Sequence, residues 1–281
     1  MEIKTLEDID IKDILTVFNT SFSDYFIPFR LTEAQLESKM KADKVSLNFS
    51  VGVFENDKLI AFILHGFDNI NTEKVIYNGG TGVIPEKRGS GLTKKMYHFI
   101  LPILKEQGIS TLVLEVITKN TQAIKSYKKS GYKTERVLNC YKGDIHIANT
   151  KNNVLIKELH DYDWNVMQSF WDISPTWQNS NNVLDTLKNT NMSLGAYINN
   201  ELVGYVIYNP NSKRLQQIAI SKHFRQEKIA STLIWKLIAE YGSSLSIINV
   251  DKSSESINTF LQKIGFKKTL EQLEMKLQLE Y

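Results

Sequence analysis

The chain has 281 residues, of which 42% are hydrophobic and 23% charged, and a net charge of +3. This length suits one large or two ordinary domains, and the composition is that of a globular protein that buries its own cores. The charge is spread along the chain without a basic tail, so we do not expect a nucleic-acid substrate. The single cysteine, Cys140, excludes an internal disulfide, and no Cys/His spacing suggests a metal site.

The first residues, MEIKTLEDIDIKDIL, are acidic where a signal peptide would be basic and then apolar. No later run approaches the roughly 18 apolar residues that a membrane helix needs. We therefore expect a cytoplasmic protein that is not bound in a membrane.

The first half of the chain alternates helical and strand-like patterns. A helical apolar face over residues 9–22 precedes a short helix at which Thr32 and Gln35 have capping-box spacing. Between the two, residues 23–28 place aromatic side chains and a carboxylate in a loop, where a ligand could meet them. The strands are predicted at 45–54, 58–67, 75–84, 111–117 and 134–141, and two further helices after residue 91 and over 120–130.

Polarity rises over residues 143–153 and the periodicity stops, so we place a domain junction there. A similar order then returns, with Arg88–Thr93 corresponding to Arg225–Ala230 and Gly131 to Gly265. We therefore predict a duplication into two α/β domains, residues 1–145 and 154–281, each with a central sheet covered by helices. The predicted elements of the second domain are strands at 154–159, 194–198, 202–208, 215–220, 245–250 and 270–279, and helices at 161–171, 181–189, 229–241 and up to 264.

Residues 81–95, TGVIPEKRGSGLTKK, predict the end of a strand, a tight loop and the first turn of an amphipathic helix. This arrangement is typical of an anion site, because the first N–H groups of a helix lack intrahelical acceptors and glycine leaves room for a phosphate. Arg88 adds a positive charge beside it. By itself, a Gly-Ser-Gly turn before a helix is more often a plain connection than an anion site.

Two segments, GVIPEKRGSGLTKKMY and LEVITKNTQAIKSYKKSGY, together resemble the GNAT superfamily of acyl-CoA N-acyltransferases. The first is similar to that family's Arg/Gln-x-x-Gly-x-Gly/Ala pyrophosphate loop, and the second to its strand, Asn, helix, Tyr and Gly-aromatic block. The resemblance covers residues 1–145 well. Over residues 154–281 it extends to the order of helices and strands. It implies two GNAT-like domains, each with a mixed, largely antiparallel sheet flanked by helices. Thr93 departs from the pattern, since the family usually has Gly or Ala there.

The resemblance also implies a binding site for acetyl-CoA. Val83 and Ile84 would offer main-chain groups to the pantetheine arm, which would lie against the sheet as an added strand. The same close approach would explain Gly79, Gly80 and Gly82 in that strand. Asn120 would bond the arm near the thioester. Backbone N–H groups would hold the pyrophosphate, and the loop residues that supply them are Arg88, Gly89, Ser90, Gly91, Leu92 and Thr93.

The implied chemistry is attack of an amine on the thioester, followed by departure of a thiolate that needs a proton. Tyr127 matches the family's general acid. Its phenol, with a reference pKa near ~10, is protonated at pH 7 and can protonate a thiolate of pKa ~8.5 if its surroundings narrow that gap. The general base stays open between Glu115, Asp24 and an ordered water.

The second half departs further from the family pattern. Gln226 and Lys228 replace the two loop glycines, Leu261 stands at the position of Tyr127, and Ser254 at that of Asn120. We therefore predict that the second domain is catalytically silent. Its aromatic and polar segment 175–179 could shape an acceptor pocket, and is equally compatible with a capped surface loop.

The predicted function is an acetyl-CoA-dependent N-acetyltransferase that works without a metal on a small-molecule or peptide amine. The alternative is a non-catalytic protein that binds an acyl-CoA as a sensor or scaffold. The combination of loop glycines, Asn120 and Tyr127 favours catalysis, because a binding protein would need the loop but not the tyrosine. A P-loop nucleotide site is excluded, because the chain has no Gly-x-x-x-x-Gly-Lys-Ser/Thr run.

Overall fold

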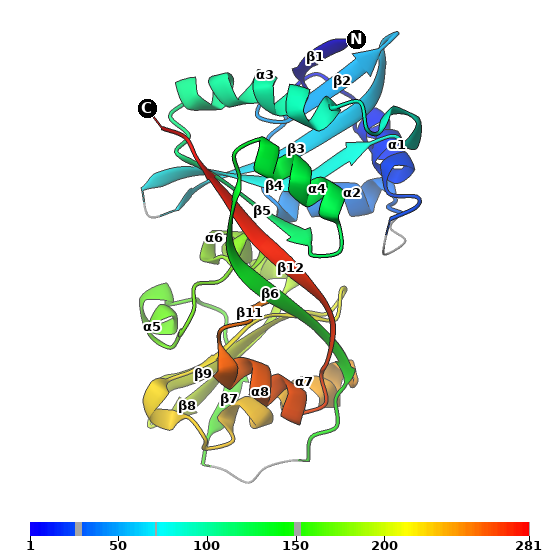
Figure 1. The fold of residues 1–281 in the computed structure, drawn as a ribbon. Coiled ribbons are helices and arrows are strands. Elements are labelled where there is room, and N and C mark those ends of the chain that lie inside the picture. Colours follow the sequence, from blue (N-terminus) through cyan, green and yellow to red (C-terminus); the bar gives the residue numbers. More distant parts are fainter. Residues whose placement is uncertain (26–29, 71, 149–152, 281) are drawn as a thin grey trace. The chain divides into compact units, whose positions relative to one another are not determined.

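The computed structural model describes residues 1–25, 30–70, 72–148 and 153–280. The chain forms two compact units, one of residues 1–135 together with 273–281, and the other of residues 136–272. These units differ from the predicted segments 1–145 and 154–281, because the last strand of each half leaves the unit in which that half began (Figure 1).

The exchanged strands are β6 (Lys133–Asp144) and β12 (Lys267–Gln278). Most of β6 belongs to the second unit, where it pairs with β11 (Ser244–Asp251). The end of β12 belongs to the first unit, and just beyond it the Leu279 N–H donates to the Ser110 carbonyl at 2.8 Å. Met275 is fully buried in the core of the first unit. The first unit is therefore completed by residues distant in sequence, whereas the second is one continuous segment.

The first unit has a mixed sheet in the order β1-β2-β3-β4-β5-β12. Its pairs are antiparallel from β1 to β4 and parallel between β4 and β5. The remaining elements are β1 (Glu2–Thr5), α1 (Ile11–Ser21), α2 (Glu33–Ala42), β2 (Val51–Glu55), β3 (Lys58–Ile70), β4 (Glu73–Val83), α3 (Leu92–Glu106), β5 (Thr111–Ile117) and α4 (Thr121–Lys129).

Each face of this sheet carries its own hydrophobic core, since alternate strand residues point to opposite faces. Ile63 packs in a cluster with α3 and α4, whereas its neighbours Phe62 and Leu64 pack with α1 and α2. Helices therefore cover both faces, as predicted (Figure 1). The predicted strand 45–54 is shorter than expected, because Ser46–Ser50 form turns in which Phe49 and Ser50 donate to carbonyls three residues earlier.

A gap opens between β4 and β5. Among the described residues their ladder ends at the pair Tyr77 and Val113, although β4 continues to Val83 and β5 to Ile117. The register of β4 against β3 also shifts between Leu64 and His65, so that Gly79 forms a β-bulge. The bulge bends β4 at the point where it leaves β5.

The second unit repeats this plan in the order β6-β11-β10-β9-β8-β7, with β10 and β11 parallel. Its ladder ends at Leu215 and Ile247, and Gln216 takes the place of the bulged Gly79. The predicted helix 161–171 is shorter, because the Asp163 side chain caps it. The other elements are β7 (Leu155–Glu158), α5 (Trp164–Ser169), α6 (Asn181–Thr186), β8 (Met192–Ile198), β9 (Glu201–Asn209), β10 (Arg214–Ile220), α7 (Ile229–Tyr241) and α8 (Glu255–Lys263).

Candidate active site

The loop before α3 has an open backbone. Gly89 and Gly91 have φ of +76° and +74°, and a Cβ added at either would meet nothing within 4 Å. α3 begins at Leu92 without a side-chain cap, whereas α1, α2 and α4 have caps from Asp10, Thr32 and Asn120. Helix N–H groups that no side chain caps, beside glycines that leave space, suit a bound phosphate.

The side chain of Arg88 is turned away from that space. Its two terminal nitrogens donate to the Asp24 carboxylate at 2.6 and 2.8 Å, and one of them also donates to the Ser21 carbonyl at 2.9 Å. The positive charge that Arg88 was expected to add beside the loop is therefore paired with a carboxylate. The arginine instead ties the segment after α1 to the end of β4. The hydrogen bond from Arg88 also lowers the pKa of Asp24, which makes that carboxylate a poor base.

Some of the main-chain groups at the end of β4 already form hydrogen bonds within the protein. The Ile84 N–H donates to Ile60 O at 3.1 Å, and the Ile84 carbonyl accepts from Lys87 N–H at 3.0 Å. The Val83 carbonyl accepts from Arg88 Nε at 3.3 Å. The Ile84 N–H therefore bonds to β3, and the alternation of an antiparallel ladder turns the Val83 N–H to the other side of the strand.

Two of the strand glycines are explained by the protein's own packing. A Cβ at Gly82 would lie 2.4 Å from the Phe62 ring, and one at Gly79 would lie 2.9 Å from the Asp43 carboxylate. Packing within the protein is therefore sufficient to explain these two glycines without a bound molecule. They allow α1 and α2 to pack closely against β4.

Tyr127 lies on α4 with its ring among other tyrosines. It is 8% exposed and contacts Tyr97 and Tyr132 edge to face, with centroids 6.4 and 5.8 Å apart. Burial raises the pKa of the Tyr127 hydroxyl, and hydrogen bonds with Thr81 and Asn78 partly offset that effect. The hydroxyl therefore stays protonated at neutral pH.

The same polar cluster continues into the core. Asn78 Nδ2 donates to Thr81 Oγ1 and to Tyr97 Oη, each at 2.8 Å, and the Tyr97 and Tyr132 hydroxyls are 3.1 Å apart. The sequence reasoning missed Asn78, Thr81, Tyr97 and Tyr132. A signal was present, because the corresponding residues of the second half, Leu215, Ile218, Ile234 and Phe266, are all apolar.

Asn120 caps α4 through its side-chain oxygen, which accepts from Ala123 N–H at 3.1 Å. Its amide nitrogen points instead toward Tyr25 Oη, 3.5 Å away. The cap fixes the side chain and leaves the amide N–H groups as donors. Residues 26–29, which complete the loop that the sequence suggested for ligand contact, lie outside the described residues.

Glu115 is half-buried on β5, two residues beyond the end of the β4–β5 ladder. Its carboxylate accepts a hydrogen bond from Tyr77 Oη at 2.6 Å. Leu114 and Val116 on either side pack into the core beneath α3 and α4, so Glu115 points to the other face of the sheet. Tyr127 packs in that same core beneath α3 and α4. The two groups therefore approach the gap from opposite faces.

His65 is fully buried, and its Nδ1 lies 2.8 Å from the Phe49 carbonyl. Burial lowers the pKa of His65 to about 4, so the ring is neutral at pH 7. Among the described residues, no group of three His, Cys, Asp or Glu side chains could hold a metal ion. None of the helices in this part of the chain has the length and apolarity that a membrane crossing requires.

The corresponding loop of the second unit has the same backbone without glycine. Gln226 and Lys228 have φ of 69° and 61°, and the α7 helix also starts without a side-chain cap. Arg225 donates to the Asp172 carboxylate at 2.8 Å and to the Phe170 carbonyl at 2.9 Å, repeating the contacts of Arg88. Leu261, at the position of Tyr127, is fully buried.

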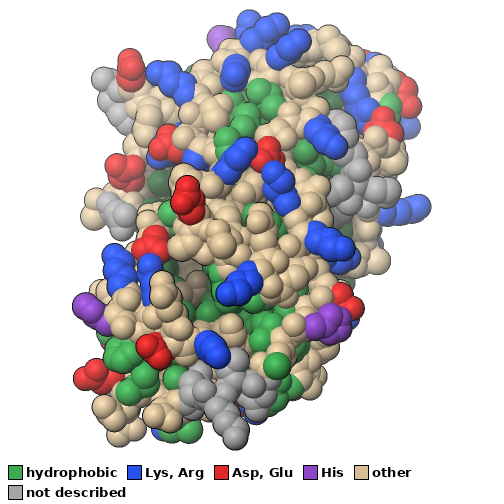
Figure 2. All heavy atoms as spheres, turned by 60° about the horizontal axis from the view of Figure 1, so that its bottom comes forward, with side chains coloured by type: hydrophobic (Ala, Val, Ile, Leu, Met, Phe, Trp, Pro, Cys, Tyr) green, Lys and Arg blue, Asp and Glu red, His purple; other side chains and the backbone are tan. Residues whose placement is uncertain are grey.

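Acidic and basic side chains are intermixed on the face drawn in Figure 2, where hydrophobic side chains also reach the surface. A single-sign basic surface of the kind that attracts nucleic acid does not dominate this face.

Comparisons with known proteins agree with this duplication. The model of the Acetyltransferase (GNAT) family matches residues 12–132, and that of the Acetyltransferase (GNAT) domain matches residues 160–277. A search of curated proteins found no match to the sequence.

Solved structures with a similar fold span almost the whole chain. A GCN5-related N-acetyltransferase from Sphaerobacter thermophilus is 11% identical, with a TM-score of 0.74 over 99% of this chain and 95% of the other. A tandem GNAT protein from the clavulanic acid biosynthesis pathway is 10% identical, with a TM-score of 0.72 over 99% and 98%. A putative acetyltransferase from Pyrococcus horikoshii is 14% identical, with a TM-score of 0.71 over 99% and 89%.

Two successive family matches, a shared fold and a repeated strand, loop and helix arrangement lead to one conclusion. The chain is a tandem member of the GNAT superfamily of acyl-CoA N-acyltransferases, which transfer an acyl group from acyl-CoA to an acceptor.

Proposed function

We propose that the protein transfers an acetyl group from acetyl-CoA to an amine, and that the reaction takes place in the first unit. The observation that carries this proposal is the Tyr127 hydroxyl, which is buried beside Thr81 and Asn78 next to the gap between β4 and β5. The second unit has Leu261 at this position and so has no proton to donate there.

The residues of the first unit suit the coenzyme. The N–H groups from Arg88 to Thr93 would bind its pyrophosphate, since Gly89 and Gly91 leave open space on that side. The Val83 N–H and the amide N–H groups of Asn120 would bind the pantetheine arm. Thr93 is only half-buried in the first turn of α3, so it leaves this arrangement possible.

Tyr127 acts as the acid in this proposal. A phenol of raised pKa gives up its proton less readily, which by itself opposes transfer to sulfur. A thiolate leaving in the same dry site is destabilised too, because desolvation raises the pKa of a thiol as it raises that of a phenol. The difference between the pKa of the phenol and that of the thiol therefore stays small enough for Tyr127 to donate its proton to the departing sulfur.

Glu115 is the better of the two carboxylates as the base. Asp24 is held by Arg88 and its pKa is lowered, whereas Glu115 faces the sheet surface on the side of α1 and α2. An amine approaching from that side would lose its proton to Glu115 while the thiolate departs toward Tyr127. The acid and base would then act on opposite faces of the reacting carbon, as direct attack requires.

The test uses the full chain with acetyl-CoA and a panel of amines that includes small polyamines, amino sugars and short peptides with free amino termini. We expect release of free thiol with at least one amine, and a rise in melting temperature with acetyl-CoA alone. Binding without thiol release from any amine would favour the sensor or scaffold alternative. No thermal shift at millimolar acetyl-CoA would exclude both.

A further inference from the structure

A tyrosine and a glutamate meet at the point where β4 and β5 separate. Tyr77 is the last residue of β4 that pairs with β5, opposite Val113, and it also pairs with Gly66 of β3. It therefore has a strand on either side, and it is only 4% exposed. A side chain fixed in this way at the centre of a sheet is suited to hold another group in place.

Tyr77 and Glu115 point to the same face of the sheet. Leu114 and Val116 flank Glu115 and pack in the core beneath α3 and α4. Ile76, beside Tyr77, packs in the same core. Because side chains alternate along a strand, Tyr77 and Glu115 both lie on the opposite face. There Tyr77 Oη donates to Glu115 Oε2 at 2.6 Å, a length typical of a hydrogen bond to an ionised carboxylate. The bond joins β4 to β5 just past the end of their ladder.

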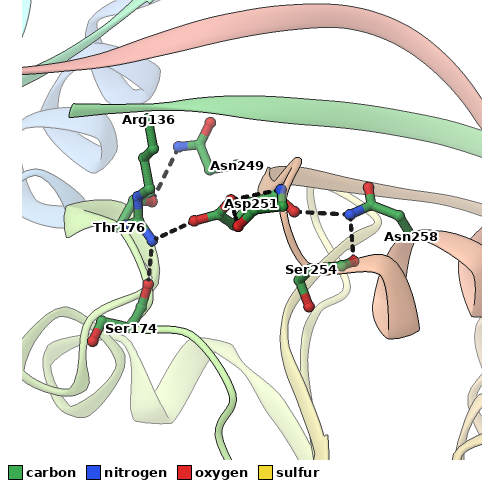
Figure 3. Close-up of polar contacts among 8 residues, drawn as sticks. Arg136, Ser174, Thr176, Asn249, Asp251, Ser254 and Asn258 are labelled. Atoms are coloured by element: carbon green, nitrogen blue, oxygen red, sulfur yellow. Dashed lines mark hydrogen bonds and ion pairs between the residues drawn. The ribbon is translucent and has the colours of Figure 1, made fainter. Parts of the chain in front are cut away.

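The second unit has a neutral amide at the same distance from its own ladder. Asn249 is two residues past the end of the β10–β11 ladder, as Glu115 is past the end of the β4–β5 ladder. Asn249 Nδ2 donates to Thr176 Oγ1 at 3.1 Å, and Arg136 holds the same segment through the Ser174 carbonyl at 2.9 Å (Figure 3). In the unit that lacks the tyrosine acid, this position therefore fixes a neighbouring segment and carries no charge.

We propose that Tyr77 is a positioning residue for the reaction, because its hydroxyl holds the Glu115 carboxylate where the amine approaches. The inference rests on the proposed function, in which Glu115 takes the proton that the nitrogen loses as its bond to the carbonyl carbon forms. The C–S bond breaks and the proton of Tyr127 goes to sulfur. Solvent then returns a proton from Glu115 to Tyr127, so that both groups are restored.

A carboxylate that is held in place reacts faster than a mobile one. A free glutamate side chain populates several rotamers, and the productive one has to be selected each time an amine binds. The bond from Tyr77 selects it beforehand, so this ordering is not part of the barrier. One hydrogen bond uses one of the roughly four acceptor sites of a carboxylate, so Glu115 can still take up a proton.

The test measures thiol release by the full chain with acetyl-CoA and three amines: spermidine, glucosamine and trialanine. Tyr77→Phe removes the hydrogen bond and keeps both the ring and the carboxylate. Glu115→Gln keeps an oxygen that can accept from Tyr77, but an amide is too weak a base to take up the proton. The double variant combines the two changes. Tyr162→Phe is the matched control, because the Tyr162 hydroxyl lies 2.7 Å from Ser193 Oγ in the second unit.

The rates are compared with the amine that the parent protein acetylates fastest. We expect Tyr77→Phe to lower kcat about tenfold and Glu115→Gln to lower it by about 10²–10⁴. KM for acetyl-CoA should change less than twofold in both, and Tyr162→Phe should match the parent. In the Glu115→Gln background, Tyr77→Phe should lower kcat less than twofold, because no base remains to be positioned.

A bond that only ties the strands together would be lost in both backgrounds, so Tyr77→Phe would then lower kcat by the same factor in each. That result would overturn the proposal, as would an unchanged kcat in Tyr77→Phe or in Glu115→Gln. Loss of the thermal shift with acetyl-CoA in Tyr77→Phe would also overturn it, because the bond would then be structural. No thiol release by the parent protein with any of the three amines would instead contradict the proposed acetyl transfer, and this inference with it.

Discussion

In the first unit, the region beside the β4–β5 gap holds Asn78, Thr81, Tyr97, Tyr127 and Tyr132, which form a buried polar cluster. The corresponding residues beside the β10–β11 gap are Leu215, Ile218, Ile234, Leu261 and Phe266, all of which pack in the hydrophobic core of the second unit. The bulge, the loop backbone and the arginine pair persist in both units. Features shared by both units therefore serve the fold, and those confined to one unit are the candidates for chemistry.

This comparison indicates a structural role for Arg88. A loop arginine next to two glycines suggests a phosphate ligand. The second unit retains the same arginine, with the same carboxylate and carbonyl partners, next to Gln226 and Lys228. Since the contact survives without the glycines, it fastens the segment after the first helix to the end of the bulged strand in both units.

The largest effect on activity should come from substitution of Tyr127, the residue that most clearly distinguishes the first unit from the second. Tyr127→Phe removes the proton donor and keeps the ring, so we expect turnover to fall by about 10²–10⁴ with acetyl-CoA affinity within about twofold. Initial rates of thiol release and calorimetry measure the two quantities. Tyr208→Phe is the matched control, because the Tyr208 hydroxyl is buried without a partner among the described residues. Unchanged turnover in Tyr127→Phe would remove the acid role.

The exchange of β12 can be tested next. Met275→Ala removes a fully buried side chain from the first unit's core, so the free energy of unfolding should fall by about 2–4 kcal/mol. Urea denaturation followed by loss of acetyl-CoA binding measures this directly in the first unit. Lys276→Ala, on the next and only half-buried position, is the control. If the urea concentration at which acetyl-CoA binding is lost is the same in Met275→Ala as in the parent protein, β12 does not stabilise the first unit.

The buried histidine predicts a pH dependence confined to the first unit. The pKa of His65 falls from 6.5 to about 4 on folding, so the unfolded chain binds an extra proton between these values. Stability is therefore full above pH 6.5 and decreases as the pH falls, by about 2 kcal/mol between pH 7 and pH 5. The second unit has Tyr208 at the corresponding strand position.

Urea midpoints at the two pH values, compared between the parent protein and His65→Gln, isolate this contribution. The variant should lose most of the difference between pH 7 and pH 5. An identical pH dependence in the variant would show that His65 is not the titrating group.

The smallest effect concerns the loop. Gly91→Lys copies Lys228 into the first unit, so we expect acetyl-CoA to bind about tenfold more weakly, with about 1 kcal/mol lost in stability from the left-handed backbone. Gly91→Ala is the control, since it carries the backbone strain with only a methyl group. Equal affinity in the lysine and alanine variants would indicate that the lysine side chain does not obstruct the phosphate.

The sequence by itself determined the local parts of this protein. The loop at 88–93, the helix that follows it and the N-cap at Asn120 depend on neighbouring residues, and each lies where it was predicted. The duplication was also evident, because two halves with the same order of elements repeat the loop and its flanking strand and helix. The positions of Gly89, Gly91 and Tyr127 follow from these local patterns.

Only the tertiary structure decided which side chains meet. Arg88 and Asp24 are far apart in sequence, and so are Asn78 and Tyr97, so local spacing could not predict that they bond. The same is true of β12, which completes the first unit although it ends the chain. The packing reason for the strand glycines at 79 and 82 could not be predicted either, since the atoms that exclude a side chain there belong to Asp43 and Phe62. Contacts between residues distant in sequence are set by the packing of elements, and packing appears only in three dimensions.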